Sequence, residues 1–382
     1  MQEEITMERI VYIGIDVHKD TNTAHLFTRT EDAVIDYEMG TIVAGSDYMI
    51  KAIKKVLKDF NLTGYQVQAG YEAGPTGYGL CKALQKAGYN CEVMAPTTIK
   101  RAPGERTKTD RRDAKMLAMA LATYSYKPVY ILNDKDLSIR EFTRTRNTRK
   151  NELKKAKQFL LSFLLRIGKS YPDSGSYWTQ KHWAWLETLD LKDEYLNYSL
   201  KSYMQDIKDL ENKIKIMDAM IEEIAFTDER YKEKVGKLMC FTGIETYTAL
   251  SIVCEIGNFD RFLDAKSFSS YIGLVPGQDS SGQRQRYTNI TKTGNSRVRR
   301  LLVEATKGIK HSSVFNKSRR LIERQTGQNP EIIAYADKCR QRIKHRMTNL
   351  EIRNGKNANV ATTAGARELA CFVWGMMTGN VA

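Results

Sequence analysis

The chain has 382 residues, of which 42% are hydrophobic, and its formal net charge is +15 at pH 7. The length exceeds one ordinary domain and the hydrophobic content excludes a disordered polypeptide, so two or three folded domains are expected. The positive surplus concentrates anions around the protein, and nucleic acid is the commonest large anionic partner; a merely basic soluble protein is the alternative.

The sequence carries no recognisable signal for export or membrane insertion. Residues 1–9 are polar and acidic and lack the pattern of a signal peptide, and no apolar run approaches the ~18 residues of a membrane helix. The six cysteines form no CxxC pair and only five histidines occur, which argues against a zinc site or a disulfide scaffold. We therefore expect a cytoplasmic protein without a membrane partner.

The first third of the chain predicts an α/β domain. Short β-branched runs at 10–16, 21–29 and 33–43 indicate a three-stranded meander. Ser46 is expected to cap a helix that runs to about Lys58. The elements expected next are a strand at 65–71, a helix from about 77 to 87, a strand at 91–94 and a helix from near 110 to about 124. This alternation predicts a layer of helices on a mixed sheet.

From Lys127–Pro128 onward the pattern becomes helical. Residues 137–168 are strongly basic, and apolar residues in 204–226 repeat at alternating spacings of three and four, which predicts a coiled-coil seam. The seam consists of Ile207, Leu210, Ile214, Met217, Ile221 and Ile224. The segment 170–200 holds three of the four tryptophans and is interpreted as a helical elbow or insertion.

A third unit begins near Gly236. Residues 237–262 place a glycine turn between two short helical patterns, which indicates either a helix-hairpin-helix that grips a phosphate backbone or an ordinary αα-hairpin. A loop rich in Gly, Ser and Arg follows, then a helix from about Ser296 and a helical tail over 329–382. The expected domains are therefore residues 1–127, 128–232 and 233–382.

Four carboxylates stand at positions that suit a two-metal site. Asp16 ends the first predicted strand, Glu72 ends the fourth, and Asp110 and Asp113 are three residues apart at a helix start, where both can face the same way. Carboxylate oxygens suit Mg²⁺, and two such ions about 4 Å apart stabilise the attacking and leaving oxygens of phosphoryl transfer. Each acid also has a simpler explanation as a loop residue, a solvated group or a helix cap. Together they favour a site for Mg²⁺, for which Mn²⁺ can substitute.

Basic residues flank the two aspartates of this helix. They are Lys100, Arg101, Arg106, Lys108, Arg111 and Arg112. They would hold DNA phosphates beside an acidic pocket, or they form a solvated helix face.

Three segments around these acids resemble a known family. YIGIDVHKD, YEAGPTGY and KTDRRDAKMLA match the blocks of the DEDD transposases, whose first domain resembles the Holliday-junction resolvase fold of the ribonuclease H-like class. FSSYIGLVPGQDSSGQRQRYTNITKTGNSRVRRLL resembles the carboxy-terminal transposase domain of the same family. The family includes Piv-type DNA invertases and insertion-sequence transposases described as bridge-RNA-guided recombinases. One departure is the hairpin turn, where the usual PGIG is replaced by FTGIE.

The resemblance implies a role for each matched residue. Asp16, Glu72, Asp110 and Asp113 take the metal-binding positions, and Ser281 takes that of the nucleophilic serine, with Ser280 adjacent. Arginines nearby would bind nucleic acid and match the geometry of a phosphate. These are Arg284, Arg286, Arg297, Arg299 and Arg300, in addition to Arg111 and Arg112. The resemblance further implies target and donor DNA, a structured bridge RNA, a prokaryotic cell and its nucleoid, and a homo-oligomer between dimer and tetramer.

Three other functions compete with this interpretation. A metal-only junction-resolving nuclease would use water as its nucleophile, and the serine loop would then only bind DNA. Sugar kinases and actin-like ATPases share the opening strand motif, but the second phosphate loop that they require is missing from the sequence. A non-enzymatic nucleic-acid scaffold would leave the four acids unexplained.

Overall fold

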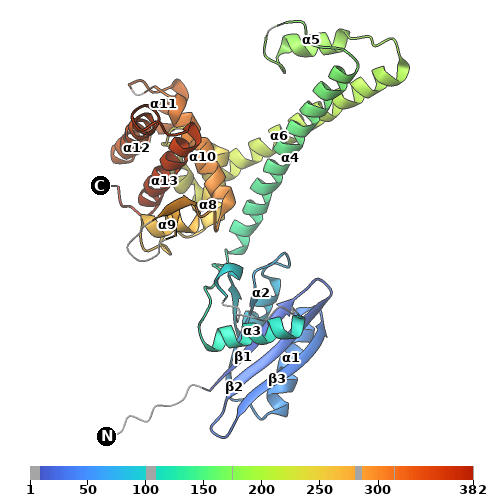
Figure 1. Cartoon of the computed structure of the whole chain (residues 1–382), viewed down its shortest axis with the longest axis vertical. Helices are drawn as coiled ribbons and strands as arrows, with labels where there is room; N and C mark the ends of the chain where they lie inside the picture. The colour runs from blue at the N-terminus through green and yellow to red at the C-terminus, as the bar shows by residue number, and fades with distance from the viewer. Residues whose placement is uncertain (1–8, 100–108, 174, 280–285, 314, 382) are drawn as a thin grey trace. The chain divides into compact units, whose positions relative to one another are not determined.

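One mixed sheet organises the N-terminal third of the chain (Figure 1). Its strand order is β3-β2-β1-β4-β5, in which β1 runs antiparallel to β2 and parallel to β4. The strands are β1 (Ile10–Val17), β2 (Thr21–Arg29), β3 (Val34–Val43), β4 (Gln66–Glu72) and β5 (Asn90–Met94). The predicted meander and the two later strands are confirmed, and the order is consistent with the ribonuclease H-like class.

The structure is a computed structural model that describes residues 9–99, 109–173, 175–279, 286–313 and 315–381. The chain divides into two units, residues 1–131 and 132–382. The first is a mixed α/β layer and the second is mainly helical, as the sequence predicts.

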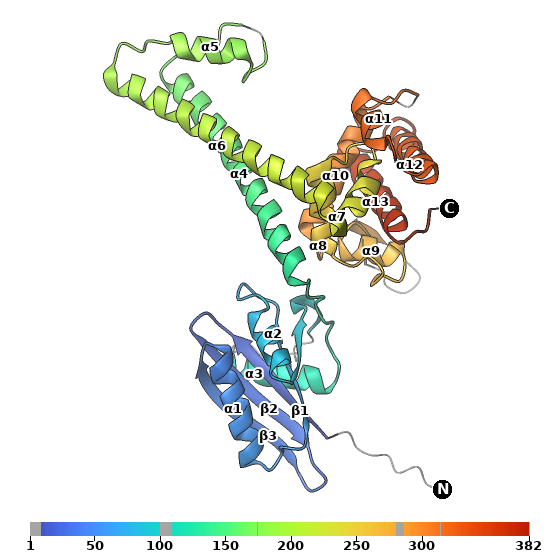
Figure 2. The ribbon, with the colours of Figure 1, turned by 180° about the vertical axis from the view of Figure 1, so that it is seen from behind.

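Helices cover both faces of the sheet in the first unit. Side chains of β1 alternate between the faces, so Val11, Ile13 and Ile15 join the core beneath α1 (Ser46–Asp59) and α2 (Gly79–Lys86). Helix α3 (Asp110–Ala122) lies on the opposite face, as the front and rear views show together (Figure 2). The short helix η1 (Pro96–Thr98) follows β5.

The prediction that Ser46 caps α1 is wrong. The helix begins at Ser46 itself, and the cap position is occupied by Gly45, which has no side chain to offer the first amides.

The contact between α3 and β1 requires a glycine. A Cβ on Gly14 would stand 2.1 Å from the carbonyl oxygen of Ala114 and 2.2 Å from the amide nitrogen of Ala118. Both are backbone atoms of α3, so no side-chain rotation can make room. The backbone of α3 therefore rests directly on the backbone of β1.

Ion pairs fasten the first turns of α3 to β3. Lys115 binds Asp36 at 2.5 Å, and His25 of β2 also hydrogen-bonds to Asp36. These partners lower the pKa of Asp36, the Lys115 hydrogen bond being the main cause. Arg111 pairs with Glu38 at 2.7 Å. The beginning of α3 is thus held to β3 by two ion pairs.

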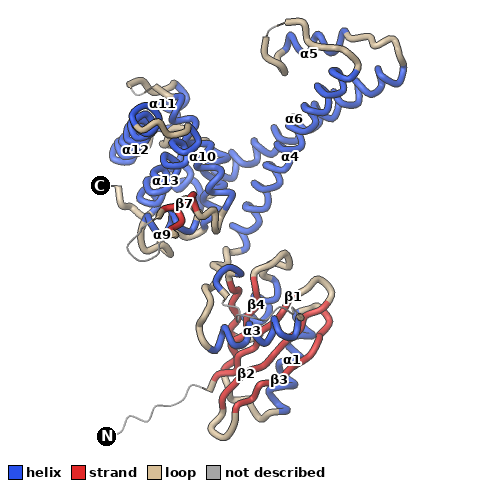
Figure 3. Tube along the Cα trace, in the orientation of Figure 1, coloured by secondary structure: helices blue, strands red, loops and turns tan. Residues whose placement is uncertain are grey.

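A long antiparallel helix pair opens the second unit. Its helices are α4 (Asp134–Arg166) and α6 (Glu194–Thr227), and α5 (Gln180–Thr188) lies between them in the chain (Figure 3). Arg146 pairs with Asp218 at 2.7 Å and Lys157 with Glu211 at 2.6 Å, so later residues of α4 meet earlier residues of α6.

The predicted apolar seam faces inward, since Ile207, Ile214 and Ile221 are all buried. Helix α6 begins at Glu194, ten residues before the predicted seam, because Asp193 caps it by accepting a hydrogen bond from the amide of Leu196. The tryptophan-rich segment forms α5 and its approach, where His182 is fully buried among the rings of Tyr171, Trp178 and Trp185.

The rest of the second unit packs around one large core. Its helices are α7 (Glu229–Met239), α8 (Thr246–Ile256), α9 (Ala265–Tyr271), α10 (Ser296–His311), α11 (Arg319–Gln325), α12 (Pro330–Thr348), the short η2 (Asn349–Arg353) and α13 (Ala358–Met377). The segment expected as a loop after α9 instead contains a two-stranded hairpin, β6 (Pro276–Gln278) and β7 (Tyr287–Ile290). Helices α7 and α8 form the predicted hairpin, and its turn packs onto α10, since a Cβ on Gly243 would lie 2.3 Å from the carbonyl oxygen of Ala305.

Among the described residues, none of the helices combines the length and apolar character needed to cross a lipid bilayer.

Substituting Gly14 tests the contact between α3 and β1. We expect Gly14→Ala to lower the free energy of unfolding by roughly 1–3 kcal/mol, because overpacking against backbone forces α3 to shift. Urea unfolding followed by circular dichroism measures the change. Gly64→Ala is the matched control, since a Cβ there meets nothing within 4 Å. Equal stability of the two variants would contradict the contact.

Candidate active site

Two carboxylates reach the same edge of the sheet from neighbouring parallel strands. Gly14 of β1 is paired with Gly70 of β4, and Asp16 and Glu72 each follow two residues later. Because side chains alternate along a strand, Asp16 and Glu72 lie on the same face as these glycines. That face carries α3, whose first turn supplies the other two acids.

A cleft of about 620 Å³ opens at this edge. Asp16, Glu72 and Asp113 all line it, together with His18 and Lys19. The loop after β4 forms one wall with Ala73, Gly74, Pro75 and Thr76. Three of the four predicted acids therefore share one cavity.

The fourth acid joins the others through a histidine. His18 Nε2 lies 3.2 Å from a carboxylate oxygen of Asp16 and 3.6 Å from one of Asp110. Asp16, His18 and Asp110 each offer a ligand atom, and these atoms lie within 4.8 Å of one another. His18 is not among the site residues that the sequence predicts. The spacing from Asp16 could have indicated His18, because residues two apart at the end of a strand point to the same side.

The simpler explanation of Asp110 as the cap of its helix is wrong. Thr109 occupies the cap position of α3, and its hydroxyl oxygen accepts a hydrogen bond from the Arg112 amide at 3.4 Å. Asp110 is therefore the first residue of the helix and does not cap it. The positive end of the helix dipole favours both Asp110 and Asp113 in this turn.

The surroundings of Asp16 shift its pKa. Burial is the main cause that raises the pKa of Asp16, and the charges of Asp113 and Asp110 raise it further, while His18 opposes the shift. A cation among these groups would remove the repulsion. The oxygen-rich donor set fits hard divalent ions such as Mg²⁺ or Mn²⁺, whereas one imidazole among carboxylates does not make a typical zinc site.

The predicted nucleophile, Ser281, lies outside the described residues. The neighbouring Ser280 and Arg284 also lie outside them, as do the basic residues within 100–108. The base of the serine loop is described: the Asp279 amide donates to the Arg286 carbonyl oxygen at 2.8 Å, which joins the ends of the hairpin.

The remaining predicted arginines have different surroundings. Arg299 donates to the carbonyl oxygens of Ile272 and Thr293, and it thus braces the segment before α10. Arg300 is exposed and donates to Asn147 of α4 at 2.7 Å. Arg297 lies 4.0 Å from Glu255.

A buried carboxylate, which the sequence analysis missed, organises the start of α10. Glu255 accepts two hydrogen bonds from Arg144 of α4, at 2.8 and 3.0 Å, and one from Asn295, the cap of α10, at 3.0 Å. Burial alone would raise the pKa of Glu255, but the bonds from Arg144 and Asn295 outweigh burial and lower it. The position of α10, and of the arginines on its first turn, thus depends on Glu255.

Models of known families match two separate stretches of the chain. A DEDD transposase model of the IS110 type, described as a transposase, matches residues 13–168, and a model described as the transposase IS116/IS110/IS902 family matches residues 236–320. The first match contains all four acids, and the second contains the hairpin and its loop.

Individual relatives are similar over almost the whole chain. The transposase for insertion sequence element IS1533 of Leptospira borgpetersenii is 31% identical over 92% of this chain and 99% of its own length. The putative transposase y4qE of Sinorhizobium fredii is 30% identical over 96% of this chain and 88% of its own. The transposase for insertion sequence element IS1328 of Yersinia enterocolitica is 23% identical over 84% of this chain and 90% of its own length.

Removing one charge from the cleft tests its affinity for cations. We expect Asp16→Asn to weaken Mn²⁺ binding by at least tenfold, because the change removes an anionic ligand at a cost of about 1.4 kcal/mol or more. Isothermal titration calorimetry on the full chain measures it. Asp32→Asn, at an exposed turn between β2 and β3, is the control. Unchanged affinity in Asp16→Asn would exclude Asp16 as a ligand.

The raised pKa of Asp16 predicts a pH dependence. Above the ordinary value of 3.8, Asp16 still binds a proton over a range in which an unperturbed carboxyl group has lost it. A cation must displace that proton, so Mn²⁺ affinity should begin to fall at a higher pH than for an ordinary carboxylate site. Titrations at decreasing pH measure the onset. An affinity that stays constant until the pH reaches 3.8 would be incompatible with the raised pKa.

Proposed function

The chain belongs to the IS116/IS110/IS902 family of transposases, and on that premise we propose that it cuts and rejoins DNA through a covalent serine–DNA intermediate. The observation that carries the proposal is the cleft shared by Asp16, Glu72 and Asp113, to which His18 joins Asp110. Acids held this close in a basic chain suit metal-assisted chemistry on a phosphodiester.

The four carboxylates would hold divalent cations, Mg²⁺ or Mn²⁺, at the cleft. Cations bound there supply positive charge for the phosphate oxygens during transfer. His18 positions Asp16 and Asp110 through its ring nitrogen, and Lys19 adds a positive charge at the rim. The acids themselves fix the place at which the phosphate must lie.

Ser281 supplies the attacking oxygen. Its hydroxyl oxygen forms a bond to a DNA phosphorus, the hydroxyl proton passes to a base, and the bond from phosphorus to one deoxyribose oxygen breaks. The released DNA hydroxyl takes up a proton. In the second step, a hydroxyl of another DNA end attacks the phosphoserine, and the serine oxygen leaves and regains its proton. One phosphodiester is broken and one is formed, so no external energy source is required.

Basic residues hold the nucleic-acid backbones during these steps. Arg297 and Arg300 begin α10, and Arg286 stands at the base of the serine loop. With Arg111, Arg112, Arg284 and Arg299, they neutralise phosphates of target and donor DNA. A structured bridge RNA selects the sequences by base pairing, so the protein need not read bases itself.

Each predicted domain has its own task in this proposal. Residues 1–127 carry the acids, residues 128–232 form an antiparallel coiled coil, and residues 233–382 carry the serine loop. In a dimer or tetramer, the acids of one subunit act with the serine of another, as the family resemblance implies. The inward-facing seam of α6 supports the coiled coil.

A metal-only nuclease is the second candidate, and one observation favours it. Asp16, Glu72, Asp113 and His18 all belong to the first unit, so their cleft is built without any residue of the second. In that case water attacks the phosphorus and DNA is cut without attachment to the protein.

Substituting the serine separates the two functions. The full chain is incubated with Mg²⁺, its cognate RNA and DNA, then denatured and examined for DNA bound covalently to protein. We expect wild type and Ser280→Ala to form the adduct and Ser281→Ala to lose it, because only the Ser281 oxygen forms the bond. Circular dichroism checks that each variant is folded.

Three outcomes would overturn the assignment of Ser281 as the nucleophile. An adduct that persists in folded Ser281→Ala assigns the bond to another residue. Cleavage by wild type without any adduct assigns the chemistry to water and supports the nuclease. Loss in Ser280→Ala alone would move the nucleophile by one residue.

A further inference from the structure

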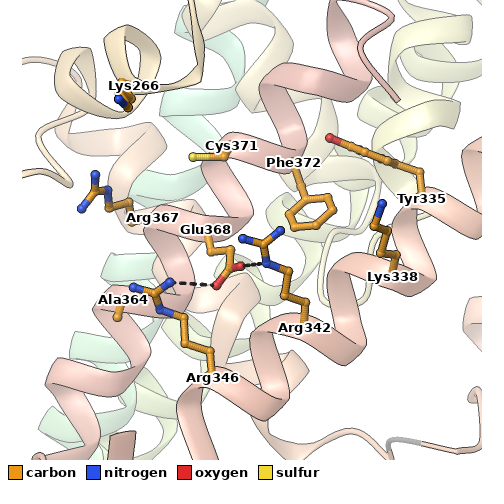
Figure 4. A pocket seen from close by; sticks show the side chains of 10 residues that line it. All are labelled: Lys266, Tyr335, Lys338, Arg342, Arg346, Ala364, Arg367, Glu368, Cys371 and Phe372. Carbon is orange, nitrogen blue, oxygen red and sulfur yellow. Dashed lines mark ion pairs between the residues drawn. The ribbon is translucent and has the colours of Figure 1, made fainter. Parts of the chain in front are cut away.

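A second polar pocket lies in the helical unit, among α9, α12 and α13 (Figure 4). Its volume is about 420 Å³. Five cationic side chains and one carboxylate are among its lining residues: Lys266, Lys338, Arg342, Arg346, Arg367 and Glu368. Apart from Lys266, these residues lie beyond both stretches that match the family models. We propose that this pocket binds the phosphodiester backbone of a nucleic acid.

Glu368 organises two of the cations. It is buried on α13, and both Arg342 and Arg346 of α12 turn toward it, with Arg346 at 3.6 Å (Figure 4). A buried carboxylate between two guanidinium groups fixes the direction of both. It neutralises only one of the five positive charges. The pocket therefore keeps a strong positive field with its arginines already oriented.

The row of cations on α12 is longer than a single anion. Lys338, Arg342 and Arg346 follow one another at intervals of four residues and so form a stripe on one face of the helix. The helix rises about 12 Å over eight residues. A free phosphate would cover one of these groups, whereas successive phosphates of a strand can engage the whole row.

The remaining wall is aromatic. The rings of Tyr335 and Phe372 lie 4.9 Å apart between centroids, and the Arg342 guanidinium stands 5.9 Å from the centroid of Phe372. The Phe372 ring therefore lies within cation–π range of the charged end of Arg342, which Glu368 also orients. Packing does not account for the cations themselves, because Lys338, Arg342 and Arg346 are exposed.

The inference rests on the proposed function in one respect: the anion is taken to be DNA or RNA. The pocket does not take part in the chemistry, so it serves to hold a strand. Lys338 and Arg367 can both be changed without leaving Glu368 unpaired, since the ion pairs of Glu368 are with Arg342 and Arg346.

The experiment measures binding of the full chain to two labelled probes of mixed sequence, a DNA duplex and a single-stranded RNA, by fluorescence anisotropy at several salt concentrations. We expect Lys338→Gln with Arg367→Gln to weaken binding on the order of tenfold and to reduce the salt slope by about 1 to 2, because two phosphate contacts are lost. Lys51→Gln with Lys54→Gln, exposed on α1, removes the same charge elsewhere and should leave both quantities nearly unchanged. Equal thermal unfolding of the variants confirms the fold.

The outcomes are separable. A loss confined to one probe supports the pocket and identifies which nucleic acid occupies it. An unchanged affinity and slope in the pocket variant, or an equal loss in the α1 control, overturns the inference while the proposed function stands. Failure of wild type to bind either probe overturns the proposed function, and with it the assignment of the pocket to a nucleic acid.

Discussion

The backbone of α3 lies directly against Gly14 of β1, and the geometry of the acidic cleft depends on this contact. Asp16 and Glu72 are fixed by the sheet, because Asp16 is the penultimate residue of β1 and Glu72 is the last residue of the parallel strand β4. Asp110 and Asp113 reach them only if the start of α3 lies close to β1. The absence of a side chain at Gly14 permits that approach, and the ion pairs of Lys115 and Arg111 with β3 hold the helix in register.

The protein separates its charges by location. Three of the four acids line one cleft of the first unit and His18 connects the fourth to them, although the chain as a whole carries a net charge of +15. Burial is the main cause of the raised pKa of Asp16, and the charges of Asp113 and Asp110 raise it further. A cleft of this kind needs cations, and the positive surfaces elsewhere need anions. A phosphodiester with bound metal ions meets both requirements, because it brings negative charge to the basic surfaces and positive charge to the acids.

Buried carboxylates carry a different task in the helical unit. Glu255 joins α4, α8 and the cap of α10, and Glu368 joins α12 to α13 through two arginines. In both places a buried acid orients cations that stand at a surface. Removing either acid would leave the guanidinium groups that it binds without a fixed direction. The loss of such a buried ion pair destabilises a fold more than the loss of a surface ion pair does.

The sequence by itself determined most of the local elements and singled out the four acids as candidates, because strand alternation and helix periodicity are set by neighbouring residues. It also indicated the helical pair, since Ile207, Ile214 and Ile221 recur every seventh residue. Only the tertiary structure decided the role of His18, the burial of Glu255 and the pocket between α12 and α13. Each depends on segments that are distant in the chain, and a glycine such as Gly14 gives no side-chain pattern from which its contact can be predicted. The packing of segments that are distant in the chain therefore determined features that the spacing of residues could not predict.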